Sequence, residues 1–209
     1  MTSALPKIRG GDAVRSALLE AAGTMLGEVG PRRLSVRDVA DRAGVNHGQV
    51  HHYFGGKRPL LEEAMRQLAR RHYEHALALS GDLPYPPPLS LAEDSDYWRA
   101  VTQVVMDGDF ELARIEIDDG ISVPRRALAH LEASRSSSTD PLDVKAEFAA
   151  IAAAQLGWVA FENFLFLLAD VKRDQHENIR RRVRALMQQA IDETADQGTT
   201  VRRQERDTE

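Results

Sequence analysis

The chain has 209 residues, 43% of them apolar, and a net charge of −5, which suits one or two modest globular domains. It contains no cysteine, which excludes disulfides, thiolate metal sites and thiol nucleophiles and favours an intracellular compartment. The N-terminal segment lacks an apolar run of signal length, and no continuous apolar run reaches the ~18 residues that span a bilayer. We therefore expect a soluble, cytoplasmic protein with no membrane partner.

Charge is distributed unevenly along the chain. Residues 1–80 carry 12 Lys and Arg against 8 Asp and Glu, and they hold five of the seven histidines. The remaining 129 residues carry 15 Lys and Arg against 24 Asp and Glu. This asymmetry favours a nucleic-acid-binding head on an acidic body, although an ordinary solvated surface can show the same imbalance.

Two segments interrupt an otherwise helical pattern. Four of the nine prolines lie in LPYPPPL, residues 83–89, which predicts a linker because proline disrupts helix interiors. SRSSSTDP, residues 134–141, predicts a loop. No alternating run of useful length predicts a β-strand, so the expected fold class is all-α.

The N-terminal third predicts four helices, over residues 11–28, 35–44, 47–53 and 57–80. Apolar side chains recur in them at helical spacing. The Ser35 hydroxyl can cap the second helix, with Asp38 completing a capping box. Gly44 is the expected C-terminal stop, and Asn46 can cap the third helix.

Two short helices joined by a turn with a central glycine are the helix-turn-helix arrangement, whose second helix enters the major groove of DNA. The segment LSVRDVADRAGVNHGQVHHYFGGKRPLLEEA, residues 34–64, resembles the N-terminal domain of the tetracycline-repressor (TetR) family of bacterial transcription regulators. The resemblance covers residues 18–61, and its matching features are Leu34 to Ala40, Ala43-Gly44-Val45, Gly48, Tyr53-Phe54, Lys57 and Leu60-Leu61. It implies a three-helix DNA-binding domain at residues 1–56. A larger helical effector-binding and dimerisation domain follows at residues 57–209, with helix 57–80 connecting the two.

The resemblance also implies which residues meet DNA. The candidates lie on the third helix and around it: Ser35, Arg37, His47, Gly48, Gln49, His51, His52, Tyr53 and Lys57. The Gln49 amide suits the N6 and N7 edge of adenine, whereas Ser35, Arg37, Tyr53 and Lys57 suit phosphates. Lys7 and Arg9 are expected to form either an arm into the minor groove or a frayed, solvated terminus.

Three histidines in six residues raise the alternative of a metal site. His47 and His51 stand four apart on the expected helix, but a zinc site needs three or four ligands, and no H-E-x-x-H motif is present. No Ser-His-Asp grouping is suggested either. We therefore expect no metal, cofactor or catalytic residue. Where the family commonly has Lys and Tyr this chain has His47 and His51, so phosphate affinity is expected to be weaker and pH-sensitive.

The C-terminal part predicts two long helices. The first covers residues 142–170. Between Leu156 and Ala169 its only polar residues are Glu162 and Asn163. Such a helix must be buried on more than one side, and an amphipathic helix follows at residues 175–195. The resemblance implies that these C-terminal helices form a four-helix homodimer interface. Shorter helices are expected between the linker and this pair.

Aromatic and apolar residues of the body suggest an effector cavity with a few polar groups. The candidates are Trp98, Met106, Phe110, Trp158, Phe161 and Glu162. Ordinary core packing is the alternative for each of them. Glu162 and Asn163 need partners inside an apolar stretch, either across the dimer or on a ligand.

The expected function is that of a homodimeric transcription regulator that binds double-stranded operator DNA. Most simply it is a repressor released from a palindromic operator by a small apolar or amphipathic molecule. Two other classes stay open: a DNA-binding module controlled by a protein partner, and a helical enzyme. The enzyme lacks support because the paired Glu-x-x-His motifs of helical di-iron proteins are absent.

Overall fold

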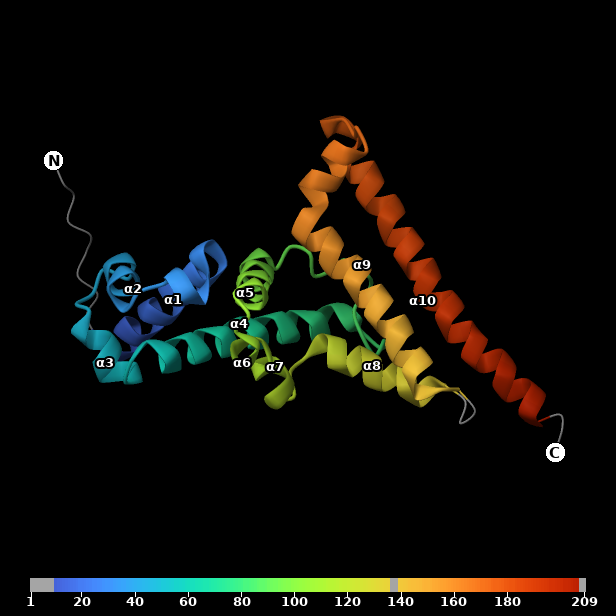
Figure 1. The fold of residues 1–209 in the computed structure, drawn as a ribbon, viewed down its shortest axis with the longest axis horizontal. Coiled ribbons are helices and arrows are strands. Elements are labelled where there is room, and N and C mark those ends of the chain that lie inside the picture. The colour runs from blue at the N-terminus through green and yellow to red at the C-terminus, as the bar shows by residue number, and fades with distance from the viewer. Residues whose placement is uncertain (1–9, 136–138, 207–209) are drawn as a thin grey trace. The chain divides into compact units, whose positions relative to one another are not determined.

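The computed structural model describes residues 10–135 and 139–206, with side chains described as far as Asp192. These residues form α-helices, one 3₁₀ turn and no strand (Figure 1), so the all-α expectation is confirmed. The helices are α1 Gly11–Arg33, α2 Val36–Arg42, α3 Gly48–Phe54, α4 Lys57–Ser80, α5 Ser95–Met106, α6 Phe110–Ala113, α7 Ile115–Asp118, α8 Val123–Ser134, α9 Pro141–Leu168 and α10 His176–Arg206. The expected arm residues Lys7 and Arg9 lie outside the described residues.

α1 is longer than predicted and contains a break. The sequence predicts an end near Glu28, whereas α1 runs to Arg33. Gly30 has φ 75° and ψ 166°, a conformation essentially restricted to glycine, and Pro31 starts a final helical turn. The break therefore redirects the chain just before α2, which local spacing alone did not indicate.

The described chain forms two compact units. The first comprises residues up to Glu74 together with Asp94–Ser122, and the second comprises His75–Glu93 together with the residues from Val123 onward. α5, α6 and α7 therefore pack with the N-terminal helices. The functional boundary expected between residues 56 and 57 stays a prediction, since this grouping describes packing alone.

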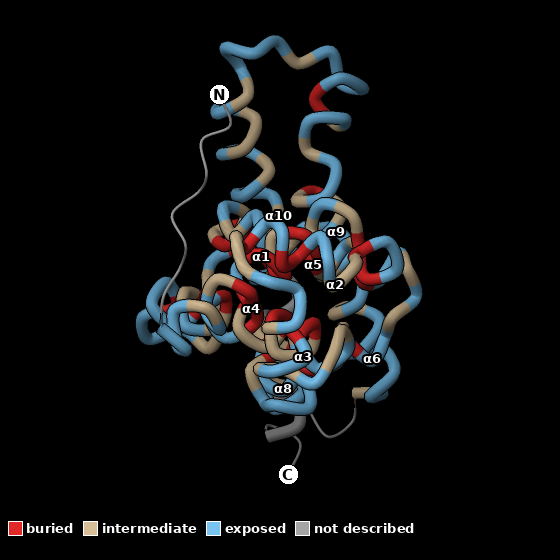
Figure 2. The backbone as a smooth tube through the Cα atoms, turned by 90° about the vertical axis from the view of Figure 1, so that its left-hand side faces the viewer, coloured by how far each residue is buried: buried red, intermediate tan, exposed pale blue. Residues whose placement is uncertain are grey.

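The first unit has the larger core. Buried residues, coloured red along the backbone in Figure 2, follow α1, α4 and α5. They include Leu18, Leu26, Leu60, Met65 and Val104. α1 and α5 approach closely, because a Cβ built on Gly27 would lie 2.8 Å from the Cβ of Arg99. The absence of a side chain at Gly27 thus permits this crossing.

The second unit has a small core around Leu89, Trp158 and Phe166. Leu89 lies in the proline-rich segment that the sequence predicts as a linker. The segment is non-helical as expected, but Leu89 is buried and packs against this core. The segment is therefore a packed part of the second unit.

α9 is the long apolar helix expected over residues 142–170, and many of its large side chains are exposed. Phe161, Phe164, Leu167 and Leu168 are each 55% to 74% exposed. By length and composition α9 could also cross a membrane, because an 18-residue window has mean hydropathy 1.5, with 11% of that window buried. The sequence expectation concerned a continuous apolar run of ~18 residues, which α9 does not contain, so this averaged hydropathy is a different and more permissive criterion. Alanines raise the average hydropathy across the polar interruptions, so counting continuous apolar residues missed it.

α10 is longer than the helix predicted over residues 175–195. It starts at His176 and extends to Arg206. Its apolar side chains Ile179, Val183 and Met187 pack against the core of the second unit. The predicted loop at residues 134–141 includes residues 136–138, which lie outside the described residues.

Candidate nucleic-acid interface

α2 begins with the predicted cap. The Ser35 hydroxyl oxygen accepts the backbone N–H of Asp38 at 3.1 Å and donates its own proton to Asp38 Oδ2 at 2.5 Å. In a standard capping box, the side chain at the Asp38 position accepts from the backbone N–H of the cap residue. Here the Asp38 carboxylate accepts from the Ser35 hydroxyl instead. The start of α2 is fixed by these two residues.

The turn between α2 and α3 is closed by backbone hydrogen bonds. Gly44 has φ 67°, and its N–H donates to the carbonyl of Asp41 at 3.2 Å. The Val45 N–H donates to the Ala40 carbonyl at 3.0 Å, which completes a Schellman motif. Asn46 Oδ1 then accepts the Gly48 N–H at 2.8 Å. This turn sets the direction of α3 relative to α2.

α3 has one buried side and one exposed side. Val50 is fully buried, and Tyr53 and Phe54 pack partly against the same core. On the other side His47, Gly48, His51 and His52 are exposed, and Gln49 is half-buried. The structure therefore places the DNA-contact candidates His47, Gly48, Gln49, His51 and His52 on α3 or directly before it.

Gly48 has a structural explanation of its own. A Cβ at this position would lie 3.2 Å from Asn46 Oδ1, the atom that caps α3. Glycine lets this cap approach closely. Close approach of DNA to Gly48 stays a prediction.

The predicted phosphate contacts differ in their surroundings. Arg37 is exposed and only loosely paired with Asp41, at 3.9 Å. Lys57 lies half-buried at the first position of α4. The Tyr53 hydroxyl lies close to the start of α1: a Cβ built on Gly11 would be 3.3 Å from its oxygen. The Ser35 oxygen is occupied by the α2 cap, so Arg37, which is exposed, is the most accessible of the four candidates.

One of the three histidines contacts an aromatic ring of the same helix. The ring of His52 meets that of Tyr53 edge-on, with centroids 4.8 Å apart. Among the described side chains, those of residues 10–135 and 139–192, no group of three or more His, Asp or Glu is placed to hold a metal ion.

The sequence did not predict the ion pairs that connect the helix-turn-helix segment to neighbouring helices and loops. Arg58 Nη1 donates to Asp109 Oδ2 at 2.7 Å, and Arg42 pairs with Glu28 at 2.6 Å. The hydrogen bond with Asp109 raises the pKa of the Arg58 guanidinium above its ordinary value. Arg58 and Asp109 lie 51 positions apart, so no local pattern could have paired them.

A buried polar network lies elsewhere in the same unit and was also missed. His72 Nδ1 lies 2.7 Å from Asp94 Oδ2, and its ring stacks on Tyr97 at 3.9 Å. The Tyr97 hydroxyl donates to Glu116, which also accepts from Ser122 at 2.8 Å. Burial raises the pKa of both Tyr97 and Glu116. The network joins α4, α5 and α7.

The six predicted effector residues fall in both units. Trp98 is half-buried beside His72, whereas Met106 and Phe110 are 80% and 65% exposed. In the second unit, Trp158 is buried and Phe161 is exposed, and both border an apolar depression along α9. Glu162 is bound by Arg180 of α10. Their role in effector binding stays a prediction.

In a comparison with known protein families, residues 18–64 match the family model described as "Bacterial regulatory proteins, tetR family". The HTH-type transcriptional regulator BetI of Vibrio vulnificus (strain YJ016) is 43% identical over 67 residues, which is 32% of this chain and 31% of that protein. BetI of Yersinia pestis (strain Pestoides F) is 38% identical over 115 residues, or 53% and 51% of the two chains. The matched part thus spans about half or less of these relatives' length.

Solved structures share the fold over most of the chain. A tetR-family transcriptional regulator from Streptomyces coelicolor has a TM-score of 0.59 at 18% identity, covering 93% of this chain and 89% of its own. A putative TetR-family regulator from Rhodococcus sp. has a TM-score of 0.56 at 21% identity, covering 88% and 99%. At these identities the likeness extends to the fold alone.

Proposed function

Because this chain belongs to the TetR family of bacterial regulatory proteins, we propose that it is a cytoplasmic transcriptional repressor that binds a palindromic operator as a homodimer. The observation that carries the proposal is α3. It follows a fixed turn from α2, buries Val50, and leaves His47, Gln49 and His51 accessible on a helix of the size that enters a major groove.

The exposed apolar face of α9 supports the homodimer. Phe164, Leu167 and Leu168 lie on a helix whose apolar surface is covered by little of its own chain. Pairing of α9 and α10 with a second copy removes this surface from water. Two-fold symmetric heads then read half-sites about one DNA turn, or a multiple of it, apart.

Release by an apolar or amphipathic small molecule is the regulatory part of the proposal. An effector that binds better to a state with misplaced heads lowers operator affinity by its differential affinity for the two states. The body offers apolar candidates in Trp98, Met106, Phe110, Trp158 and Phe161. Native mass spectrometry of the purified dimer detects a retained molecule as mass above two chains, and operator titration with that molecule tests release. If a protein partner controls the regulator instead, no retained small molecule should change its affinity for the operator.

Selection of DNA from a random duplex library by the wild-type protein tests the DNA-binding part. We expect a palindromic sequence, bound by a dimer in sedimentation. Gln49→Ala should weaken binding to that duplex by about 1 to 3 kcal/mol and relax the preference at one base pair. A stable monomer at micromolar concentration, or an unchanged preference in Gln49→Ala, contradicts the assignment.

Lys57→Ala is the matched phosphate variant. It should weaken binding to every sequence alike and reduce the salt dependence by about one phosphate contact. The two variants together separate base reading from backbone attraction.

A further inference from the structure

One short loop contacts both ends of the helix-turn-helix segment. It runs from Asp107, which follows α5, through Gly108 to Asp109, which precedes α6. Asp107 Oδ2 accepts the backbone N–H of Arg32 at 3.0 Å, and Asp109 Oδ2 accepts from Arg58 at 2.7 Å. Arg32 precedes α2 and Arg58 follows α3. We call this three-residue loop the Asp107–Asp109 bracket.

The Asp107 end fixes how the chain enters α2. The break at Gly30 removes the usual helical acceptor for the Arg32 N–H, and the Asp107 carboxylate takes that place as a capping group. A Cβ on Gly30 would lie 2.7 Å from Asp107 Oδ2, so glycine leaves the space that the carboxylate occupies. The direction of the last turn of α1 depends on this contact.

The Asp109 end fixes how the chain leaves α3. Arg58 is the second residue of α4, and only Lys57 separates it from the glycine pair between α3 and α4. Its guanidinium binds Asp109 and also Glu62, the latter at 2.8 Å. The other Asp109 oxygen caps α6 by accepting the Leu112 N–H at 3.2 Å. Asp109 thus joins the start of α4 to α6.

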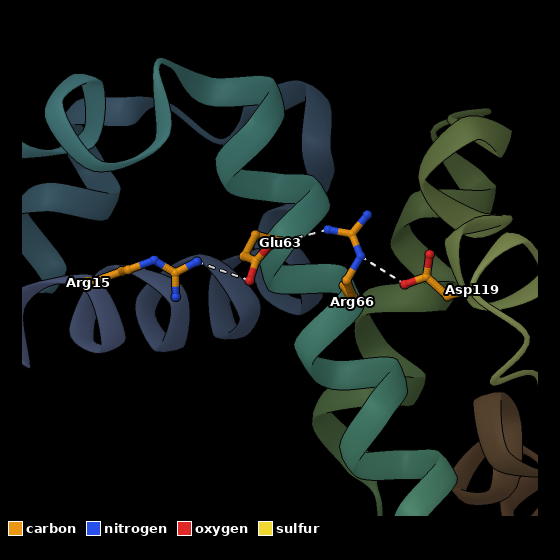
Figure 3. A network of polar contacts seen from close by, with 4 residues as sticks. All are labelled: Arg15, Glu63, Arg66 and Asp119. Carbon is orange, nitrogen blue, oxygen red and sulfur yellow. Dashed lines mark hydrogen bonds and ion pairs between the residues drawn. The ribbon is translucent and has the colours of Figure 1, made fainter. Parts of the chain in front are cut away.

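The segment that carries the bracket is itself anchored along α4. Asp119, just beyond α7, accepts from Arg66 at 2.8 Å, and Arg66 binds Glu63 at 3.2 Å (Figure 3). Glu63 in turn binds Arg15 of α1 at 3.1 Å. Arg58 and Arg66 are eight residues apart, about two helical turns, and so lie on one side of α4. The bracket is therefore held at a fixed place relative to α1 and α4.

We propose that Asp107 and Asp109 are positioning residues that orient the helix-turn-helix for sequence-specific DNA binding. The inference rests on the proposed DNA-binding function and adds a device outside the matched DNA-binding segment. Reading base edges requires α3 at a defined angle, whereas attraction to phosphates does not. Loss of the bracket therefore lowers specific binding and leaves non-specific binding nearly unchanged.

The test compares two DNA probes: a duplex selected by the wild-type chain from a random library, and a random duplex of equal length. Asp107→Ala should bind the selected duplex about tenfold more weakly, the size expected for one lost capping hydrogen bond, and bind the random duplex as wild type does. Asp107→Asn keeps an acceptor oxygen and should restore binding of the selected duplex. Asp118→Ala is the matched control, because it removes the same charge from an exposed pair with Arg114 of the same segment.

Hydrogen exchange supplies a readout independent of DNA. The amides of α2 and α3 should exchange faster in Asp107→Ala than in Asp118→Ala, with the rest of the first unit unchanged. Three results would overturn the proposed positioning role. They are an equal loss of affinity for both DNA probes in Asp107→Ala, equal DNA affinities for Asp107→Ala and Asp118→Ala, and unchanged hydrogen exchange in α2. If the wild-type chain selects no duplex, the proposed DNA-binding function is wrong. Hydrogen exchange then still shows whether Asp107 holds α2 and α3 in place.

Discussion

Glu162 of α9 accepts two parallel hydrogen bonds from the guanidinium of Arg180 of α10, each 2.8 Å long. Arg180 also lies over the ring of Phe166, 5.6 Å from its centroid. Glu162, one of the two polar residues in the apolar run of α9, thus has a partner within its own chain. This pairing ties the two long C-terminal helices together inside the second unit.

Glu162→Ala should destabilise the protein by about 1 to 3 kcal/mol, because it removes a charge-assisted, bidentate contact from a partly buried site. Glu177→Ala is the control in the same network: the Glu177 side chain is 72% exposed, and its Oε2 lies 3.4 Å from Arg180 Nη1. An exposed pair of this kind contributes about 0 to 1 kcal/mol. Denaturant unfolding at fixed protein concentration measures both, and equal effects would show that the Arg180 contact contributes little.

The same pair predicts a pH dependence. The hydrogen bonds from Arg180 lower the pKa of Glu162 below its usual range. Because the folded-state pKa is lowered, the stabilisation is complete above the ordinary glutamate pKa of about 4.3 and is lost as pH falls through the lowered value. The stability difference between wild type and Glu162→Gln should therefore shrink as pH falls below about 4.3. A difference that is constant from neutral to acidic pH argues against this ion pair.

Gly30→Ala should be more destabilising than Gly120→Ala. Both glycines have positive φ, 75° and 71°, so both substitutions introduce backbone strain. At Gly30 the new methyl group also meets Asp107 Oδ2 at 2.7 Å, whereas nothing lies within 4 Å at Gly120. We expect the Gly30 variant to cost about 1 to 3 kcal/mol more. Thermal or denaturant unfolding of the two variants measures the difference, and equal costs would mean that the carboxylate moves aside freely.

Local patterns in the sequence predicted the elements that local physics determines. Ser35 as a cap, Gly44 as a stop and Val50 as the buried side of α3 all follow from spacing within one or two helical turns. The helix-turn-helix itself was predictable for that reason. Its exposed candidates could be listed, but their contacts with DNA stay predictions.

Contacts between distant positions were not predictable. Asp107 reaches the Arg32 amide across 75 positions, and Glu162 meets Arg180 only because α9 and α10 fold back on each other. The proline pattern at residues 83–89 correctly indicated non-helical chain. It could not indicate that Leu89 packs beside Trp158 and Phe166, because that contact depends on the fold.

The exposed histidines of α3 predict pH-sensitive DNA binding. An imidazolium that contacts phosphate strengthens binding while it is protonated, so affinity should be higher in acidic than in alkaline solution. His47→Gln and His51→Gln should each flatten this dependence, whereas His130→Gln in the second unit should not. Titrations of the selected duplex at several pH values measure it. Repetition with a chelator should give the same affinities, and loss of binding with chelator would indicate a metal site.

Trp158→Ala and Phe161→Ala should separate folding from dimerisation. Trp158 is buried and meets Phe166 edge-on with centroids 5.7 Å apart, so its truncation should cost about 3 to 5 kcal/mol of stability. Phe161 is 58% exposed on the same helix. Its truncation removes little from the core of one subunit but takes an aromatic contact from the face that we propose to pair.

Phe161→Ala should therefore dissociate at higher protein concentration than wild type in sedimentation. Leu83→Ala, which changes an exposed residue outside α9 and α10, should dissociate as wild type does. An unchanged dimer in Phe161→Ala would place the interface elsewhere. Equal stability losses for Trp158→Ala and Phe161→Ala would instead mean that Phe161 is buried within its own subunit in solution, because a side chain exposed in the monomer has no core contacts to lose.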